Sequence, residues 1–103
     1  MKTVITRIWH GVVRTEQSDD YLQYVTETGV KDYKLTPGNL SVKIWRYPEG
    51  DKTHFWTVTT WDSVDSIKKF AGEDYERAHY YDRDQEFLLE FEPKVLHYET
   101  LEF

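Results

Sequence analysis

The sequence of 103 residues contains no cysteine and a single methionine. The absence of cysteine excludes disulfide bonds, thiol catalysis and metal sites with cysteine ligands. No stretch approaches about 18 consecutive apolar residues, and the N-terminal MKTVITRIWHG lacks a long apolar core, so we expect neither a membrane-spanning helix nor a signal peptide. The sequence therefore predicts a cytoplasmic protein without a membrane partner.

Basic residues are also scarce, because 13 Lys and Arg stand against 19 Asp and Glu and leave a net charge of -6. Binding to a phosphate backbone depends on clustered Lys and Arg, so this balance predicts no nucleic-acid partner. The chain has five glycines and none of the glycine motifs that bind nucleotides.

Aromatic residues, in contrast, are abundant at 17% of the chain. Their large side chains supply a core that the modest aliphatic content would not supply alone. No linker, repeat or low-complexity tract interrupts the chain, which predicts a single domain over residues 1–103.

Apolar alternation and turn residues predict four strands, and helical spacing predicts two main helices. The strands are expected at Thr3–Val13, Leu40–Tyr47, His54–Trp61 and Lys94–Leu101. The first helix is expected from an N-cap at Ser18 to about Gly29. The second begins after Asp62 or Ser63 and ends at Gly72, with Trp61 packed beneath it against Val64 or Ile67. A short helical piece is expected at Glu73–His79, and residues 82–92 fit either a helical turn or an extended arm.

This β-α-β-β-α-β order predicts an α+β protein with a ferredoxin-like antiparallel sheet. Both faces of the strands carry large side chains: Ile44, Phe55 and Trp61 have one parity, and Trp45, Trp56 and Val58 have the other. Exposing a sheet face that contains two tryptophans would be unfavourable, so we expect a homodimer in which two sheets pack together.

Four segments of the chain resemble the antibiotic-biosynthesis-monooxygenase type of dimeric α+β barrel domain. They are TRIWHG, VTTWDSVDSIKKFAG, ERAHYY and FEPKVLHYE, and together the resemblance covers nearly the whole chain. It implies a ferredoxin-like fold that pairs into a dimeric barrel. It also implies a cofactor-independent monooxygenase acting on an aromatic or polyketide-like substrate. The alternative is a non-catalytic barrel protein that binds a small ligand or haem.

Two branches of the superfamily bear on the histidines. The haem-degrading branch has an Ala-His pair after the second helix, which Ala78-His79 resembles, and there the histidine ligates the haem iron. That branch also uses an Asn on the first strand and a Trp late in the second helix, where this chain has about His10 and Phe70. Related cyclases pair a first-strand histidine with one after the second helix as acid and base, which His10 and His79 resemble.

Residue chemistry independently points to histidine, because proton transfer near neutral pH falls most naturally to its imidazole. His10 and His79 are the candidate catalytic residues, and Trp56, Phe70 and Tyr75 are the candidate substrate pocket. No metal site and no cofactor is expected. Three alternatives stay open: an ordinary helix-end role for His79, a three-histidine metal site, and a shared sheet end for His10, His54 and His97.

Overall fold

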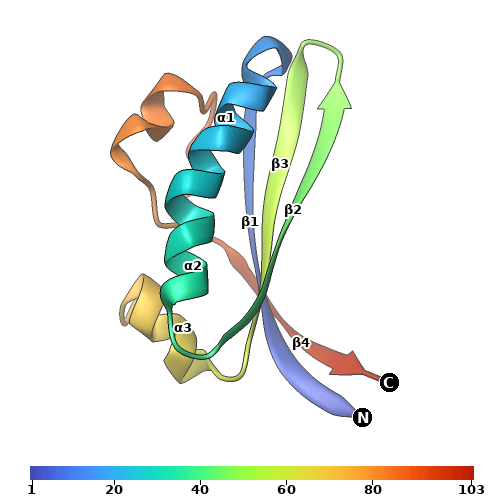
Figure 1. The fold of residues 1–103 in the computed structure, drawn as a ribbon, viewed down its shortest axis with the longest axis vertical. Coiled ribbons are helices and arrows are strands. Elements are labelled where there is room, and N and C mark those ends of the chain that lie inside the picture. The colour runs from blue at the N-terminus through green and yellow to red at the C-terminus, as the bar shows by residue number, and fades with distance from the viewer.

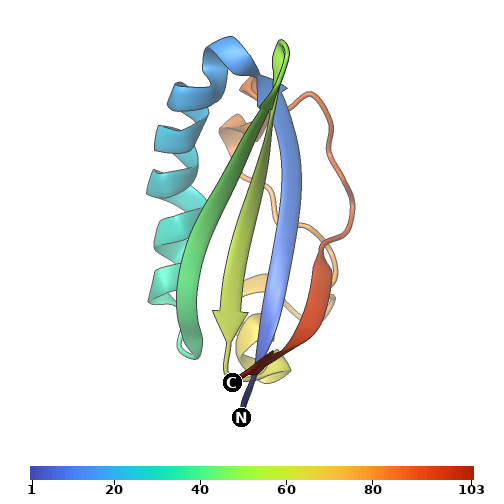
Figure 2. The same ribbon diagram turned by 90° about the vertical axis from the view of Figure 1, so that its right-hand side faces the viewer.

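The computed structural model describes residues 1–103 and contains one four-stranded antiparallel sheet with the strand order β2-β3-β1-β4. The strands are β1 (Lys2–Arg14), β2 (Asn39–Glu49), β3 (Lys52–Trp61) and β4 (Leu96–Glu102). All helices lie on one side of this sheet (Figure 1), and the opposite face is uncovered (Figure 2). The predicted ferredoxin-like order is therefore confirmed. None of the helices has the length and apolar character needed to cross a membrane.

The helical segment after β1 is longer than the sequence predicted. It runs without a break through η1 (Thr15–Gln17), α1 (Ser18–Val25), η2 (Thr26–Val30) and α2 (Lys31–Leu35). The expected end at Gly29 is wrong because the buried stripe of Tyr21 and Val25 continues to Tyr33 on the same face. Gly29 is itself buried within the wide turn of η2, where Tyr33, Tyr81 and Val25 would surround a Cβ atom.

Ser18 is not the N-cap, because the first helical turn already begins at Thr15. Its hydroxyl instead accepts a hydrogen bond from Arg46 Nη1 at 3.1 Å. The serine therefore ties the helical segment to β2.

The second main helix, α3 (Val64–Ala71), agrees with the prediction at both ends. Ser63 Oγ caps it by accepting the backbone N–H of Ser66 at 3.2 Å. Gly72 ends it with a φ of +86°, a conformation that favours glycine. Between these ends, Ile67 is buried against Trp61, as expected.

The predicted helix at Glu73–His79 is wrong. Gly72 turns the chain into an irregular segment that makes one turn-like backbone bond within itself, from the Arg77 N–H to the Asp74 carbonyl at 3.1 Å, and otherwise pairs with residues 93–95. The Ala78 N–H donates to the Pro93 carbonyl at 2.9 Å, and the Val95 N–H donates to the Glu76 carbonyl at 2.8 Å. This long-range pairing is more stable than a local helix, because one or two isolated helical turns have only marginal stability in water. The undecided stretch 82–92 contains a short 3-10 helix, η3 (Asp82–Glu86), and otherwise extends alongside β1.

The core lies between the helices and one face of the sheet. Odd-numbered residues of β1 point into it, with Trp9 and Val13 packed against Tyr21 and Val25 of α1. The β-pairing places Ile44, Phe55 and Trp61 on this face and Trp45, Trp56 and Val58 on the uncovered one. The two parities inferred from the sequence are thus correct.

Candidate functional site

His79 lies on the helix side of the sheet, in the irregular segment between α3 and η3. Its ring centroid is 5.3 Å from that of Phe70 and 5.0 Å from that of Tyr81, which it meets edge to face. It borders a surface hollow of about 390 Å³ between α2 and α3. The other residues of the hollow are Asp32, Leu35, Thr36, Pro37, Lys69 and Phe70.

Two carboxyl groups lie close to this imidazole. The Tyr81 hydroxyl donates to Asp32 Oδ2 at 2.5 Å, and burial together with this bond raises the pKa of Tyr81. Burial raises the pKa of Asp84, an effect that the Tyr81 N–H, at 2.7 Å, and the nearby His79 partly offset. Asp32 and Asp84 therefore both bond to Tyr81, whose ring packs on His79.

Of the three predicted pocket residues, only Phe70 lines this hollow. Tyr75 packs edge to face on His97, with the ring centroids 5.0 Å apart, and does not share a face with His79 because no helix forms there. Trp56 lies on the uncovered face of the sheet, 5.1 Å from the ring of His10. Tyr75 and Trp56 therefore do not line the hollow at His79.

His10 also lies on the uncovered face, since its neighbours Trp9 and Gly11 point to the helices. Within one chain, His10 and His79 are on opposite sides of the sheet and do not border the same hollow. Among the β1 residues that point to the helix side, Arg7 approaches the neighbours of His79, with its guanidinium 5.4 Å from the centre of the Phe70 ring. Strand alternation in TRIWHG places Arg7 on the same face as Trp9, and this signal in the sequence could have identified it.

His10 is instead the centre of a linear array, Glu92–His10–His54–Glu49. His10 Nδ1 contacts Glu92 Oε2, His10 Nε2 lies 2.9 Å from His54 Nδ1, and His54 Nε2 lies 3.4 Å from Glu49 Oε1. The ring centroids are 5.2 Å apart and the planes differ by 19°. This separation equals the N–N distance plus the radius of each ring, so the two nitrogens point directly at each other.

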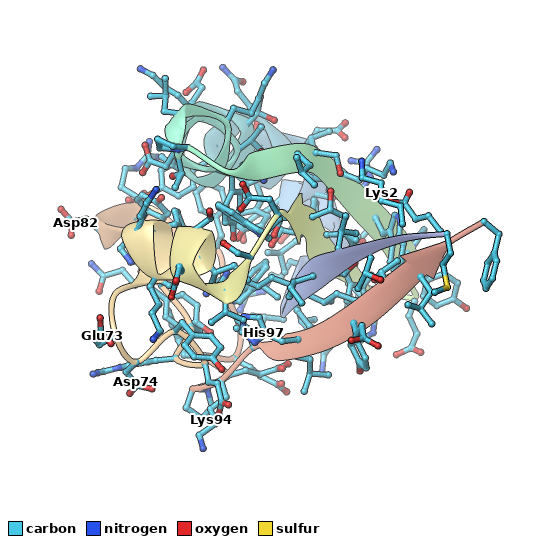
Figure 3. All side chains as sticks on the ribbon, turned by 90° about the horizontal axis from the view of Figure 1, so that it is seen from below. Lys2, Glu73, Asp74, Asp82, Lys94 and His97 are labelled. Carbon is cyan, nitrogen blue, oxygen red and sulfur yellow. The ribbon has the colours of Figure 1, made fainter.

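His97 does not join these histidines. It pairs with Arg7 across β1 and β4 and faces the helix side, near the loop that carries Glu73 and Asp74 (Figure 3). No group of three or more His, Asp or Glu side chains is arranged to hold a metal ion. The alternatives of a three-histidine metal site and a shared sheet end for His97 are therefore wrong.

The residues around His79 do not fit a haem. Aromatic side chains fill the space between α3 and the sheet. The ring centroid of Tyr33 is 4.5 Å from that of Phe70 and 6.3 Å from that of Trp61. The outer hollow has charged or polar side chains on much of its wall. A large macrocycle needs apolar walls on both of its faces, and only a smaller ring fits here.

The largest hollow, of about 880 Å³, lies elsewhere, at the β2–β3 hairpin. It is lined by Arg14, Thr15, Glu16, Gly50, Asp51, Lys52, Leu89 and Glu90. This lining is almost entirely polar and includes no histidine, so the smaller hollow at His79 is the better candidate for chemistry.

Neither a family model nor a curated protein matches this sequence. Solved structures do match its fold. A Nitrosomonas europaea protein classed with the antibiotic biosynthesis monooxygenases superimposes with a TM-score of 0.66 at 17% identity, covering 96% of this chain and 90% of its own. The fold is thus that of an antibiotic-biosynthesis-monooxygenase type α+β domain.

Two further structures show what proteins with this fold bind. The ActVA-Orf6 monooxygenase of Streptomyces coelicolor, solved with nanaomycin D, has a TM-score of 0.59 at 16% identity and coverages of 98% and 88%. The haem-degrading protein MhuD of Mycobacterium tuberculosis, solved with two haems, has a TM-score of 0.59 at 16% identity and coverages of 96% and 97%. At these identities the likeness extends to the fold alone.

Proposed function

We propose that this protein is a monooxygenase of the antibiotic-biosynthesis type that acts on a small hydroxyaromatic or polyketide-like substrate without an added cofactor. The observation that carries the proposal is the position of His79. Its imidazole borders a hollow large enough for a small molecule, between the rings of Phe70 and Tyr81 and close to the Asp84 carboxyl. A titratable base beside an aromatic wall suits the activation of a planar, acidic substrate.

In this proposal the substrate supplies the electrons. His79 accepts a proton from an acidic CH₂ flanked by aromatic rings, and the resulting carbanion transfers an electron to O₂. Recombination at that carbon and loss of water convert CH₂ into C=O, so one oxygen atom enters the product and the other leaves as water. Phe70 packs on the substrate ring, and the proton on His79 is held next to Asp84. His10, on the other face of the sheet, takes no part in this step.

We also propose that the protein is a homodimer formed through the uncovered sheet face. Large apolar side chains on this face are half exposed, including Trp45 at 52%, Tyr47 at 57% and Tyr98 at 50%. Such a concentration of exposed aromatic surface is typical of an interface.

Oxygen consumption with 1,8-dihydroxyanthrone as the probe tests the enzymatic proposal. The wild-type protein is expected to consume one O₂ per anthrone oxidised to the anthraquinone, faster than the reaction in buffer. His79→Ala should lower this rate about 10²- to 10⁴-fold, the usual contribution of a positioned general base.

His54→Ala is the matched control, because it removes an imidazole from the opposite face of the sheet and should leave the rate unchanged. A wild-type rate no faster than buffer, or equal rates for wild type and His79→Ala, would rule out this function.

A further inference from the structure

Arg7 is a buried cation without a carboxylate partner. Its side chain is 1% exposed, and none of the five ion pairs of the protein involves it. Its guanidinium donates two long hydrogen bonds, from Nη1 to the Tyr33 hydroxyl at 3.3 Å and from Nη2 to the Arg77 carbonyl at 3.4 Å. The Nε–H has no partner at all.

The surroundings do little to compensate this charge. Burial lowers the pKa of the Arg7 guanidinium, and only the Tyr33 and Tyr81 hydroxyls act in the opposite direction. His97, across the strand pair, has a buried Nε2 that also lacks a partner. An arginine stays charged in proteins, and a buried charge without a counter-ion is strongly unfavourable. Because the buried Arg7 charge lowers the stability of the fold, its role is better explained by binding of an anion than by stabilisation.

A single side chain separates Arg7 from the hollow at His79. The Phe70 ring contacts both groups, at 5.4 Å from the Arg7 guanidinium and 5.3 Å from the His79 ring. Phe70 is only partly buried and lines the hollow, so rotation of its side chain would join the hollow to Arg7. Tyr33, which accepts from Arg7, also packs on Phe70 and would form the floor of the joined space.

We propose that Arg7 is the anion-binding residue of this site and that the ligand is an aromatic anion, with a carboxylate or phenolate oxygen on the guanidinium and its ring packed on the rotated Phe70 side chain. This inference deepens the proposed function, since it assigns a negative charge to the substrate, and it rests on the same hollow. A neutral aromatic molecule of equal size binds the hollow without using Arg7.

Binding of 2-naphthoate and of its neutral analogue 2-naphthamide tests the proposal, with affinities measured by calorimetry and by thermal shift. Arg7→Met should bind 2-naphthoate at least about tenfold more weakly than the wild type, because it loses a charge-assisted hydrogen bond. Its affinity for 2-naphthamide should not change. Without ligand, Arg7→Met should unfold at no lower temperature than the wild type, because methionine removes an uncompensated buried charge.

Arg14→Met is the matched control, since it removes one positive charge from an exposed position of the same strand and should leave both affinities unchanged. Arg7→Lys keeps the charge but loses the planar fork, and it should bind 2-naphthoate with intermediate affinity even if the methionine variant does not fold. The proposal fails if wild type does not bind 2-naphthoate, or if the Arg7 variants bind it as wild type does or lose both ligands equally. Arg7-dependent binding without oxygen consumption would refute only the enzymatic function, and oxygen consumption without Arg7-dependent binding only the anion site.

Discussion

At the scale of single residues, His97 illustrates how the buried guanidinium acts on its surroundings. Burial and the charge of Arg7 lower the pKa of His97, with Glu76 opposing them in part. The imidazole is therefore held neutral, packed against Tyr75. Its environment suits a neutral ring and is unfavourable for a charged one.

This effect predicts an acid-sensitive contribution to stability. Because the unfolded state binds a proton at the ordinary value of 6.5 and the folded state only at lower pH, the unfolded state carries more protons between these two values. The contribution of His97 is thus complete above about pH 6.5 and is lost as the pH falls below it. Urea unfolding at pH 7.5 and at pH 5.5 measures how much unfolding free energy is lost on acidification. This loss should be smaller for His97→Gln than for wild type. An equal loss in His97→Gln and wild type would contradict the prediction.

The candidate site residues were predicted only in part, for a reason visible in the strands. Phe70 and His79 do meet, because both lie close to the end of α3. His10 and Trp56 lie elsewhere because strand alternation decides the face, and a shift of one position moves a side chain to the other side of the sheet. Arg7 was overlooked since a charged residue in an apolar strand is usually taken to be exposed, and its burial depends on Phe70 and Tyr33 covering it.

At the scale of elements, Trp61 joins β3 to α3. It is fully buried, its Nε1 donates to Thr59 Oγ1 at 2.8 Å, and its ring packs in a cluster with Tyr33 and Ile67. Trp61→Ala should therefore lower the unfolding free energy by about 3–5 kcal/mol, as other large-to-small core substitutions do. Guanidinium unfolding monitored by circular dichroism measures this. Leu35→Ala, at a position that is 70% exposed on the helix side, should cost far less, and similar losses for the two variants would mean that Trp61 is not part of the core.

Elements whose own residues set their ends were predicted correctly. Ser63 and Gly72 bound α3 through local chemistry, and the strands follow from alternation. The errors fall where distant contacts decide. The helical segment continues past Gly29 because Tyr33 is buried by α3 and β3, and residues 73–79 are not helical because residues 93–95 supply hydrogen-bond partners. Neither partner is adjacent in sequence, so no local pattern reveals them.

At the scale of the whole molecule, the uncovered sheet face predicts self-association. Sedimentation at micromolar concentration should show a dimer for wild type. Trp45→Asp should weaken it at least about tenfold, since it would bury a carboxylate in an apolar contact. Leu35→Asp is the control, because Leu35 is 70% exposed but lies on the helix side. A wild-type monomer, or a dimer weakened equally by both substitutions, would exclude association through this face.

The array on that face has a consequence for how charge moves across the sheet. The four ring nitrogens of His10 and His54 face two carboxylates and each other, so one added proton on the pair would give three hydrogens for these three contacts and one positive charge. The central hydrogen can reside on either ring. Its transfer along this contact, by about 1 Å, would shift the centre of positive charge by the 5.2 Å between the ring centroids, from β1 to β3, while every heavy atom stays in place. A singly protonated pair would therefore give the sheet face a dipole that reverses its direction without any change in fold.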